Sequence, residues 1–393
     1  MLAKALLPLL SLAVYVSATC APIPDVITPV ANSKLPDPFA LLEGGRVSSK
    51  AEWACRREQI SQLVQRFEVG SLPPPPESVV GAFYTEEGIS KFNVTVTDNG
   101  KSISFSSRVI LPEDGEGPFP AIIGVGYNSL PAIPGVATIL FNNDDIAQQW
   151  GAQSRGIGKF YDLYGADHSA GATLAWTWGV GRLIDALESA TGHNIDTTKL
   201  GATGCSRNGK GAFVVGAFEP RIALTIPQES GAGGAAAWRI SDAEKAAGVN
   251  IQTASQIIRE NVWLSQRFDP FVDNVVDLPH DHHFLPALIA PRGLLVIENV
   301  IDWLGPASTW GNQVAGHKVY EALGAPDNHG VSVVGNHSHC LLPESQIPEV
   351  EAFVNKFLKG DSSADTAVVH NDGDGYGFVE EDWVDWTVPD ISA

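Results

Sequence analysis

A serine in a glycine-flanked turn is the residue of this chain whose setting points most clearly to chemistry. Residues 204–210 read Gly-Cys-Ser-Arg-Asn-Gly-Lys, between a strand predicted over 199–203 and a helix predicted over 208–218. A serine at the apex of a strand–turn–helix unit exposes its hydroxyl beside the N–H groups that begin the helix. Ser206 is therefore a candidate acyl-transfer nucleophile, although the second glycine comes one residue later than in the usual Gly-x-Ser-x-Gly turn.

A serine hydroxyl is a weak nucleophile, so it requires a base, and the base requires an orienting carboxylate. His339 is the candidate base because it follows a predicted strand late in the chain, as in α/β-hydrolase folds. Two acids compete for the third role, since Glu229 and Asp302 each follow a predicted strand. The pattern of residues alone does not choose between them.

Four cysteines allow three disulfide connectivities, and their positions favour the pairs Cys20–Cys55 and Cys205–Cys340. Cys205 precedes the candidate nucleophile and Cys340 follows the candidate base. Because a disulfide holds its two Cα atoms about 5.5–6 Å apart, the second pair would bring the serine turn and the histidine loop together.

The elements that must position these residues follow an α/β pattern. Polar and apolar residues alternate over 79–111, which predicts antiparallel strands, and the apolar run over 120–125 is typical of a strand covered on both faces. Strands and helices alternate from there on, so we expect an α/β-hydrolase fold, a three-layer sandwich with a mostly parallel central sheet and antiparallel N-terminal strands. The later predicted strands are residues 199–203, 222–226, 293–298 and 331–334, and the predicted helices are residues 51–67, 176–190, 208–218, 313–323 and 347–358.

A long polar and aromatic segment, residues 235–283, separates two predicted strands. We expect it to be an insertion over the carboxyl ends of the strands, where such sheets bind ligands. Its end reads His-Asp-His-His at 280–283, but the spacing lacks the i, i+4 pattern of zinc hydrolases. We therefore expect no catalytic metal and no cofactor, and we interpret 280–283 as a loop that leads into the next strand.

The N-terminus and the composition indicate where the protein acts. Residues 1–18 combine a lysine, a short apolar run and small residues, which predicts a signal peptide and a secreted, extracellular protein without a membrane span. The formal net charge of −20 argues against nucleic acid or an anionic membrane as a partner. We expect residues 19–393 to form a single catalytic domain and a monomer. The acidic segment 361–393 should pack back through Trp383 and Trp386.

Two glycosylation sequons are present. The sequon at Asn93 lies in a strand-like run with one exposed face, so we predict a glycan there. The sequon at Asn336 lies beside His339, where a glycan would obstruct the site.

Several of these motifs together resemble the fungal glucuronoyl esterases of carbohydrate esterase family 15. They are residues 204–210, the stretch Pro-Gln-Glu-Ser-Gly-Ala-Gly-Gly at 227–234, and His339-Cys340. The resemblance extends to Lys-Phe-Tyr at 159–161, His-Ser-Ala-Gly at 168–171 and Leu-Ile-Ala-Pro-Arg at 288–292, and so to essentially the whole mature chain. Four cysteines leave no room for the third disulfide of some fungal members. The chain also lacks a four-cysteine cellulose-binding module, so we expect a catalytic domain alone.

The resemblance implies roles for individual residues. It favours Glu229 over Asp302 as the acid. The substrate-contacting residues of the family match here at Lys210, Gln252, Glu260 and Trp303. Without the resemblance, Gln252 and Glu260 would be interpreted as solvated helix-face residues and Trp303 as a core residue. Arg207 can offer the oxyanion both the N–H that follows the nucleophile and its own cationic side chain.

The expected function is that of a secreted serine esterase acting on 4-O-methyl-D-glucuronoyl esters. The resemblance implies this substrate, in which the ester would join glucuronoxylan to lignin alcohols of plant walls, and so makes that lignin–carbohydrate ester the expected partner. The reaction would pass through a glucuronoyl-enzyme intermediate. The alternatives are another carbohydrate esterase such as an acetyl xylan esterase, a peptidase of similar fold, and a non-catalytic carbohydrate-binding protein.

Overall fold

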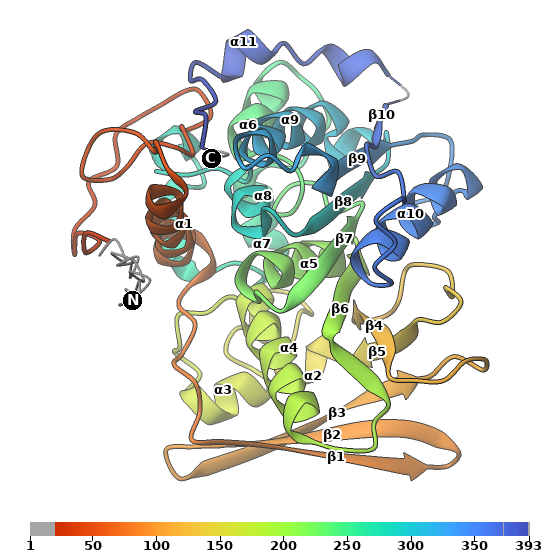
Figure 1. Ribbon diagram of the computed structural model, residues 1–393. Helices are drawn as coiled ribbons and strands as arrows, with labels where there is room; N and C mark the ends of the chain where they lie inside the picture. The colour runs from red at the N-terminus through yellow and green to blue at the C-terminus, as the bar shows by residue number, and fades with distance from the viewer. Residues whose placement is uncertain (1–19, 372, 392–393) are drawn as a thin grey trace, which may run out of the picture.

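The computed structural model describes residues 20–371 and 373–391. The predicted signal peptide, residues 1–18, lies outside the described residues. A ten-stranded sheet runs through the described part of the chain, in the spatial order β1-β2-β3-β5-β4-β6-β7-β8-β9-β10 (Figure 1). Its strands are β1 (Ser78–Glu86), β2 (Ile89–Asp98), β3 (Lys101–Ile110), β4 (Phe119–Val125), β5 (Ala137–Phe141), β6 (Ile195–Cys205), β7 (Ile222–Gln228), β8 (Gly293–Glu298), β9 (His329–Val333) and β10 (Val369–Asn371).

The direction of pairing changes once across the sheet. The pairings β1–β2, β2–β3 and β3–β5 are antiparallel, and every later pairing is parallel. The carboxyl ends of β4 and β6 to β9 therefore meet at one edge, where parallel sheets of this kind bind ligands. The predicted fold class is confirmed, including the antiparallel N-terminal strands.

Helices cover both faces of the parallel part of the sheet (Figure 1). Side chains alternate along each strand, so Leu294 and Val296 of β8 pack into the large core, whereas Leu295 and Ile297 pack against α10 (Ile347–Phe357) on the opposite face. The helices α4, α5, α8 and α9 lie on the first face, and the insertion contributes α6 and α7. The helices are α1 (Lys50–Val64), α2 (Asn143–Ile146), α3 (Lys159–Tyr164), α4 (Ala172–Ser189), α5 (Arg207–Phe218), α6 (Trp238–Ala246), α7 (Ala254–Glu260), α8 (Phe284–Ile289), α9 (Pro306–Ala322), α10 (Ile347–Phe357) and α11 (Glu380–Trp383).

Both expected disulfides are present. The Cα atoms of Cys20 and Cys55 lie 5.2 Å apart, and those of Cys205 and Cys340 lie 5.7 Å apart. The second disulfide joins the end of β6 to the loop that follows β9, across a sequence separation of 135 residues.

The C-terminal segment lies against the body of the protein. The indole of Trp386 stacks on the ring of His283 with centroids 6.2 Å apart, and its Nε1–H donates to the carbonyl of Leu35 at 2.9 Å. The side chain of Ile391 is buried. Among the helices of the described chain, none has both the length and the apolar character that crossing a membrane requires.

The His-Asp-His-His stretch is a buried loop that leads into α8. The Nε2 atoms of His280 and His282 each lie 2.6 Å from a different carboxylate oxygen of Glu68. Asp281 forms a buried ion pair with Arg239 at 3.0 Å. The contacts with Glu68 join the end of the insertion to the segment that follows α1, and the ion pair joins it to α6.

Candidate active site

Ser206 lies at the apex of a tight turn between β6 and α5. Its backbone has φ 59° and ψ −127°, a region that a residue with a Cβ rarely occupies and that is typical of strained functional turns. The glycines on either side allow close packing, because a Cβ on Gly204 would lie 2.5 Å from the carbonyl oxygen of Asn208. A Cβ on Gly209 would lie 2.5 Å from the carbonyl oxygen of Gln228. The approach of α5 to β7 therefore explains why the second glycine stands one residue late.

Glu229 is the carboxylate that holds His339. It follows β7 with φ 44° and is fully buried. Its Oε2 accepts hydrogen bonds from Nδ1–H of His339 at 2.6 Å and from the backbone N–H of Cys340 at 2.9 Å. Asp302 is exposed at the start of a short 3-10 turn. The structure thus pairs His339 with Glu229, one of the two acids that the sequence offered.

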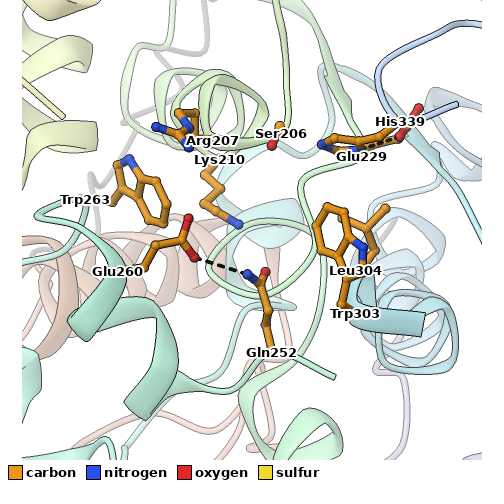
Figure 2. Close-up of a pocket in the computed structure, with 10 residues that line it drawn as sticks. All are labelled: Ser206, Arg207, Lys210, Glu229, Gln252, Glu260, Trp263, Trp303, Leu304 and His339. Carbon is orange, nitrogen blue, oxygen red and sulfur yellow. Dashed lines mark hydrogen bonds and ion pairs between the residues drawn. The ribbon is translucent and has the colours of Figure 1, made fainter. Parts of the chain in front are cut away.

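The disulfide between Cys205 and Cys340 brings the serine turn to the histidine loop, as expected from its neighbours in the sequence. Ser206 and His339 line one cavity together with every other residue predicted to contact substrate (Figure 2). The cavity has a volume of about 330 Å³. Its lining comprises Ser206, Arg207, Lys210, Glu229, Gln252, Glu260, Trp263, Trp303, Leu304 and His339.

Lys210 is a buried cation on the floor of this cavity. It lies one helical turn after Ser206, and its Nζ donates to the carbonyl oxygens of Ser230 and Ala232, each at 2.6 Å. Burial lowers the pKa of Lys210 to about 8, while the carboxylate charge of Glu260 opposes this shift. An ammonium has three N–H donors, so one remains to point at a ligand.

The insertion supplies the side of the cavity opposite Ser206 (Figure 2). The helix α7 begins with a capping box between Thr253 and Gln256, a pattern that is visible in the sequence. Gln252 precedes this cap and Glu260 is the last residue of the helix, and Nε2 of Gln252 donates to Oε2 of Glu260 at 3.1 Å. Both side chains line the cavity and offer it polar atoms.

Two tryptophans form opposite walls (Figure 2). The ring of Trp303 contacts His339 edge to face, with centroids 4.9 Å apart at 75°. Trp263, which no motif in the sequence indicates, lies under two cations, because the guanidinium carbon of Arg207 and Nζ of Lys210 are each 5.5 Å from its ring centroid. Such contacts are attractive because the face of an aromatic ring is electronegative.

A second buried carboxyl lies behind the site. Glu298, the last residue of β8, accepts hydrogen bonds from the backbone N–H groups of Gly231 and Asn299, each at 3.1 Å. Burial raises the pKa of Glu298 to about 8, and the negative charge of Glu229 adds to this. Below that pKa Glu298 is protonated, so it adds no second negative charge behind the site.

Comparison with known proteins places this geometry in a family. The sequence model described as glucuronyl esterase of fungi matches residues 94–324. The 4-O-methyl-glucuronoyl methylesterase of Hypocrea jecorina is 52% identical over 375 residues, which cover 95% of this chain and 80% of that protein. The enzyme of the same name from Thermothelomyces thermophilus is 54% identical over 358 residues, covering 90% of this chain and 88% of that protein.

Solved structures agree with these sequence matches. The glucuronoyl esterase catalytic domain of Hypocrea jecorina superposes with a TM-score of 0.90 at 52% identity, over 94% of this chain and all of that one. A serine-to-alanine variant of the Sporotrichum thermophile enzyme, in complex with methyl 4-O-methyl-β-D-glucopyranuronate, superposes with a TM-score of 0.90 at 51% identity, over 95% of this chain and all of that one. The chain belongs to the fungal glucuronoyl esterase family of carboxylic ester hydrolases.

Proposed function

We propose that this protein is a secreted, monomeric esterase that hydrolyses 4-O-methyl-D-glucuronoyl esters, of the kind that join glucuronoxylan to lignin alcohols. One observation carries the proposal: a buried carboxylate holds Nδ1 of a histidine at 2.6 Å in the same cavity as a serine on a strained turn. Relatives that carry the methylesterase name, and a neighbour that binds a methyl glucuronate ester, support the choice of substrate.

The first half of the proposed reaction forms a glucuronoyl-enzyme. Because Glu229 accepts the hydrogen bond from Nδ1–H of His339, the basic lone pair of that ring is on Nε2, which can take the proton of Ser206. The Ser206 Oγ attacks the ester carbon, and the carbonyl oxygen becomes an oxyanion. When the tetrahedral intermediate collapses, His339 returns the proton to the departing alcohol oxygen. Water repeats the sequence in the second half, and it releases the free uronic acid and Ser206.

The remaining residues that line the cavity stabilise the oxyanion and bind the sugar. Arg207 begins α5, so its backbone N–H has no acceptor within the helix, and its guanidinium adds a positive charge for the oxyanion. Lys210, Gln252 and Glu260 offer donors and acceptors to the ring hydroxyls, and Trp303 offers a flat face to the pyranose.

Three substrates and one variant test this function. We expect hydrolysis of methyl and benzyl 4-O-methyl-glucuronate but not of acetylated xylan, and we expect Ser206→Ala to abolish turnover while it melts like the wild type. Turnover by Ser206→Ala would refute the mechanism. Release of acetate from xylan at a comparable rate would favour an acetyl xylan esterase instead.

A further inference from the structure

Asn208 stands where the usual serine turn has its second glycine, and its side chain is almost fully buried. Its Oδ1 accepts hydrogen bonds from Nδ2 of Asn143 at 3.1 Å and from Nε2 of Gln149 at 3.0 Å. The turn after β4 makes room for this amide, because a Cβ on Gly126 would lie 2.4 Å from Nδ2 of Asn208. The residue that departs from the generic pattern therefore joins α5 to the first residue of α2 and to the loop that follows α2.

Gln149 carries this connection into the insertion. Its Oε1 accepts a hydrogen bond from Nε1–H of Trp263 at 2.8 Å, and its backbone carbonyl accepts one from Nδ2 of Asn261 at 2.7 Å. Gln149, Asn261 and Trp263 are all buried. A buried, hydrogen-bonded amide network is costly to break, because each group left unpaired keeps its desolvation penalty.

The network ends beside Arg207, the residue proposed above to stabilise the oxyanion. The indole of Trp263, whose orientation Gln149 sets, lies 5.5 Å from the guanidinium carbon of Arg207 (Figure 2). Helix α2 adds a carboxyl near this cation: burial raises the pKa of Asp144, and a hydrogen bond with Gln149 and then the charge of Arg207 oppose that rise. Arg207 is a long side chain with many rotamers, so a ring held in one orientation restricts where its cation points.

We propose that Asn208, Gln149 and Trp263 form a positioning relay that holds the guanidinium of Arg207 where the oxyanion develops. This inference rests on the proposed role of Arg207 in catalysis. The relay residues do not supply the positive charge, but they restrict the conformations of the Arg207 side chain that carries it. Donors that are fixed before the reaction stabilise a transition state more than mobile donors, so the relay acts on kcat rather than on ground-state binding.

Two substitutions break the relay without altering the ligands of the oxyanion. Gln149→Met removes both amide contacts at similar volume, and Trp263→Phe keeps an aromatic face but removes the N–H that Gln149 accepts. We expect each to lower kcat for methyl 4-O-methyl-glucuronate about tenfold and to change KM less than about threefold. Asn208→Asp keeps the Oδ1 acceptor and should lose less kcat than Asn208→Leu.

A matched control separates this role from general damage to the fold. Gln346 is a buried glutamine whose Nε2 donates to the carbonyl and hydroxyl oxygens of Ser332, away from the cavity. Gln346→Met should lower the melting temperature, as Gln149→Met does, but leave kcat unchanged. A similar loss of kcat in both methionine variants would overturn the relay, because both would then act through stability.

The decisive measurement repeats Gln149→Met and Trp263→Phe in an Arg207→Ala background. If the relay acts through Arg207, the additional loss of kcat falls from about tenfold to less than about twofold. An undiminished loss in that background, or unchanged kcat in the wild-type background, overturns the relay but leaves the proposed function intact. Wild-type kcat for Arg207→Ala alone would overturn both the relay and the oxyanion role of Arg207.

Discussion

Replacing Glu229 with glutamine tests the acid with little change in shape. The oxygen of a glutamine can still accept from both Nδ1–H of His339 and the N–H of Cys340, which the native Oε2 accepts at 2.6 and 2.9 Å. The substitution removes the negative charge that stabilises the imidazolium of His339, which forms as Ser206 gives up its proton. Two unit charges with centres about 4 Å apart attract by about 4 kcal/mol at an effective dielectric constant of 20.

That energy corresponds to a loss of about 1,000-fold in kcat, since each 1.36 kcal/mol is a factor of ten. The KM should change little, because the lost charge acts on the imidazolium of the transition state rather than on substrate binding. The assay is the initial rate of methyl 4-O-methyl-glucuronate hydrolysis, with thermal unfolding to verify the fold. The control is Asp302→Asn, which removes an exposed carboxylate after the next strand and should keep kcat within about twofold. A loss below tenfold for Glu229→Gln, or a larger loss for Asp302→Asn, would refute the reasoning.

Two further predictions concern the floor of the cavity and the disulfide beside it. Because burial lowers the pKa of Lys210 to about 8, Nζ loses its proton as pH rises through that value, and KM should rise severalfold between about pH 7 and pH 9. Lys210→Met should have a high KM that is independent of pH, and a constant wild-type KM over this range would contradict the role of the ammonium. The double variant Cys205→Ser/Cys340→Ser opens a loop of 135 residues, which should cost about 3–5 kcal/mol of unfolding free energy and lower kcat as well. The matching serine pair at the N-terminal disulfide should lower stability alone, and equal kcat in the two double variants would show that the internal disulfide does not position the histidine.

The sequence predicted those parts of the site that follow local rules. A strand, a turn and a helix around Ser206 are readable from apolar spacing and glycine, and both cysteine pairs follow from their number and order. The start of α9 at Pro306 was predicted too late, at residue 313, because Ser308, Thr309 and Gly311 are weak helix formers. Pro306 itself indicates the start of this helix, because proline is favoured at the first helical position.

The carboxylate that pairs with His339 could not be predicted from the positions of the strands alone. Glu229 and Asp302 both follow strands that reach the same edge, but a strand end does not determine where the next side chain points. The positive φ of Glu229 turns its carboxylate into the protein, whereas Asp302 begins an exposed turn. In the sequence, only the resemblance to a family favours Glu229 over Asp302. Trp263 was missed because its role depends on Gln149, more than a hundred residues earlier in the chain.

The disulfide that joins Cys205 to Cys340 also determines what a protease can do to this protein. All of the insertion lies between the two cysteines, and residues 245–250 within it form an exposed stretch, which is the kind of segment that proteases cut. A cut there does not release the histidine segment, because the strand that carries Ser206 and the loop that carries His339 remain one covalent molecule. Gel mobility under reducing conditions would then reveal two fragments from a preparation that still turns over substrate.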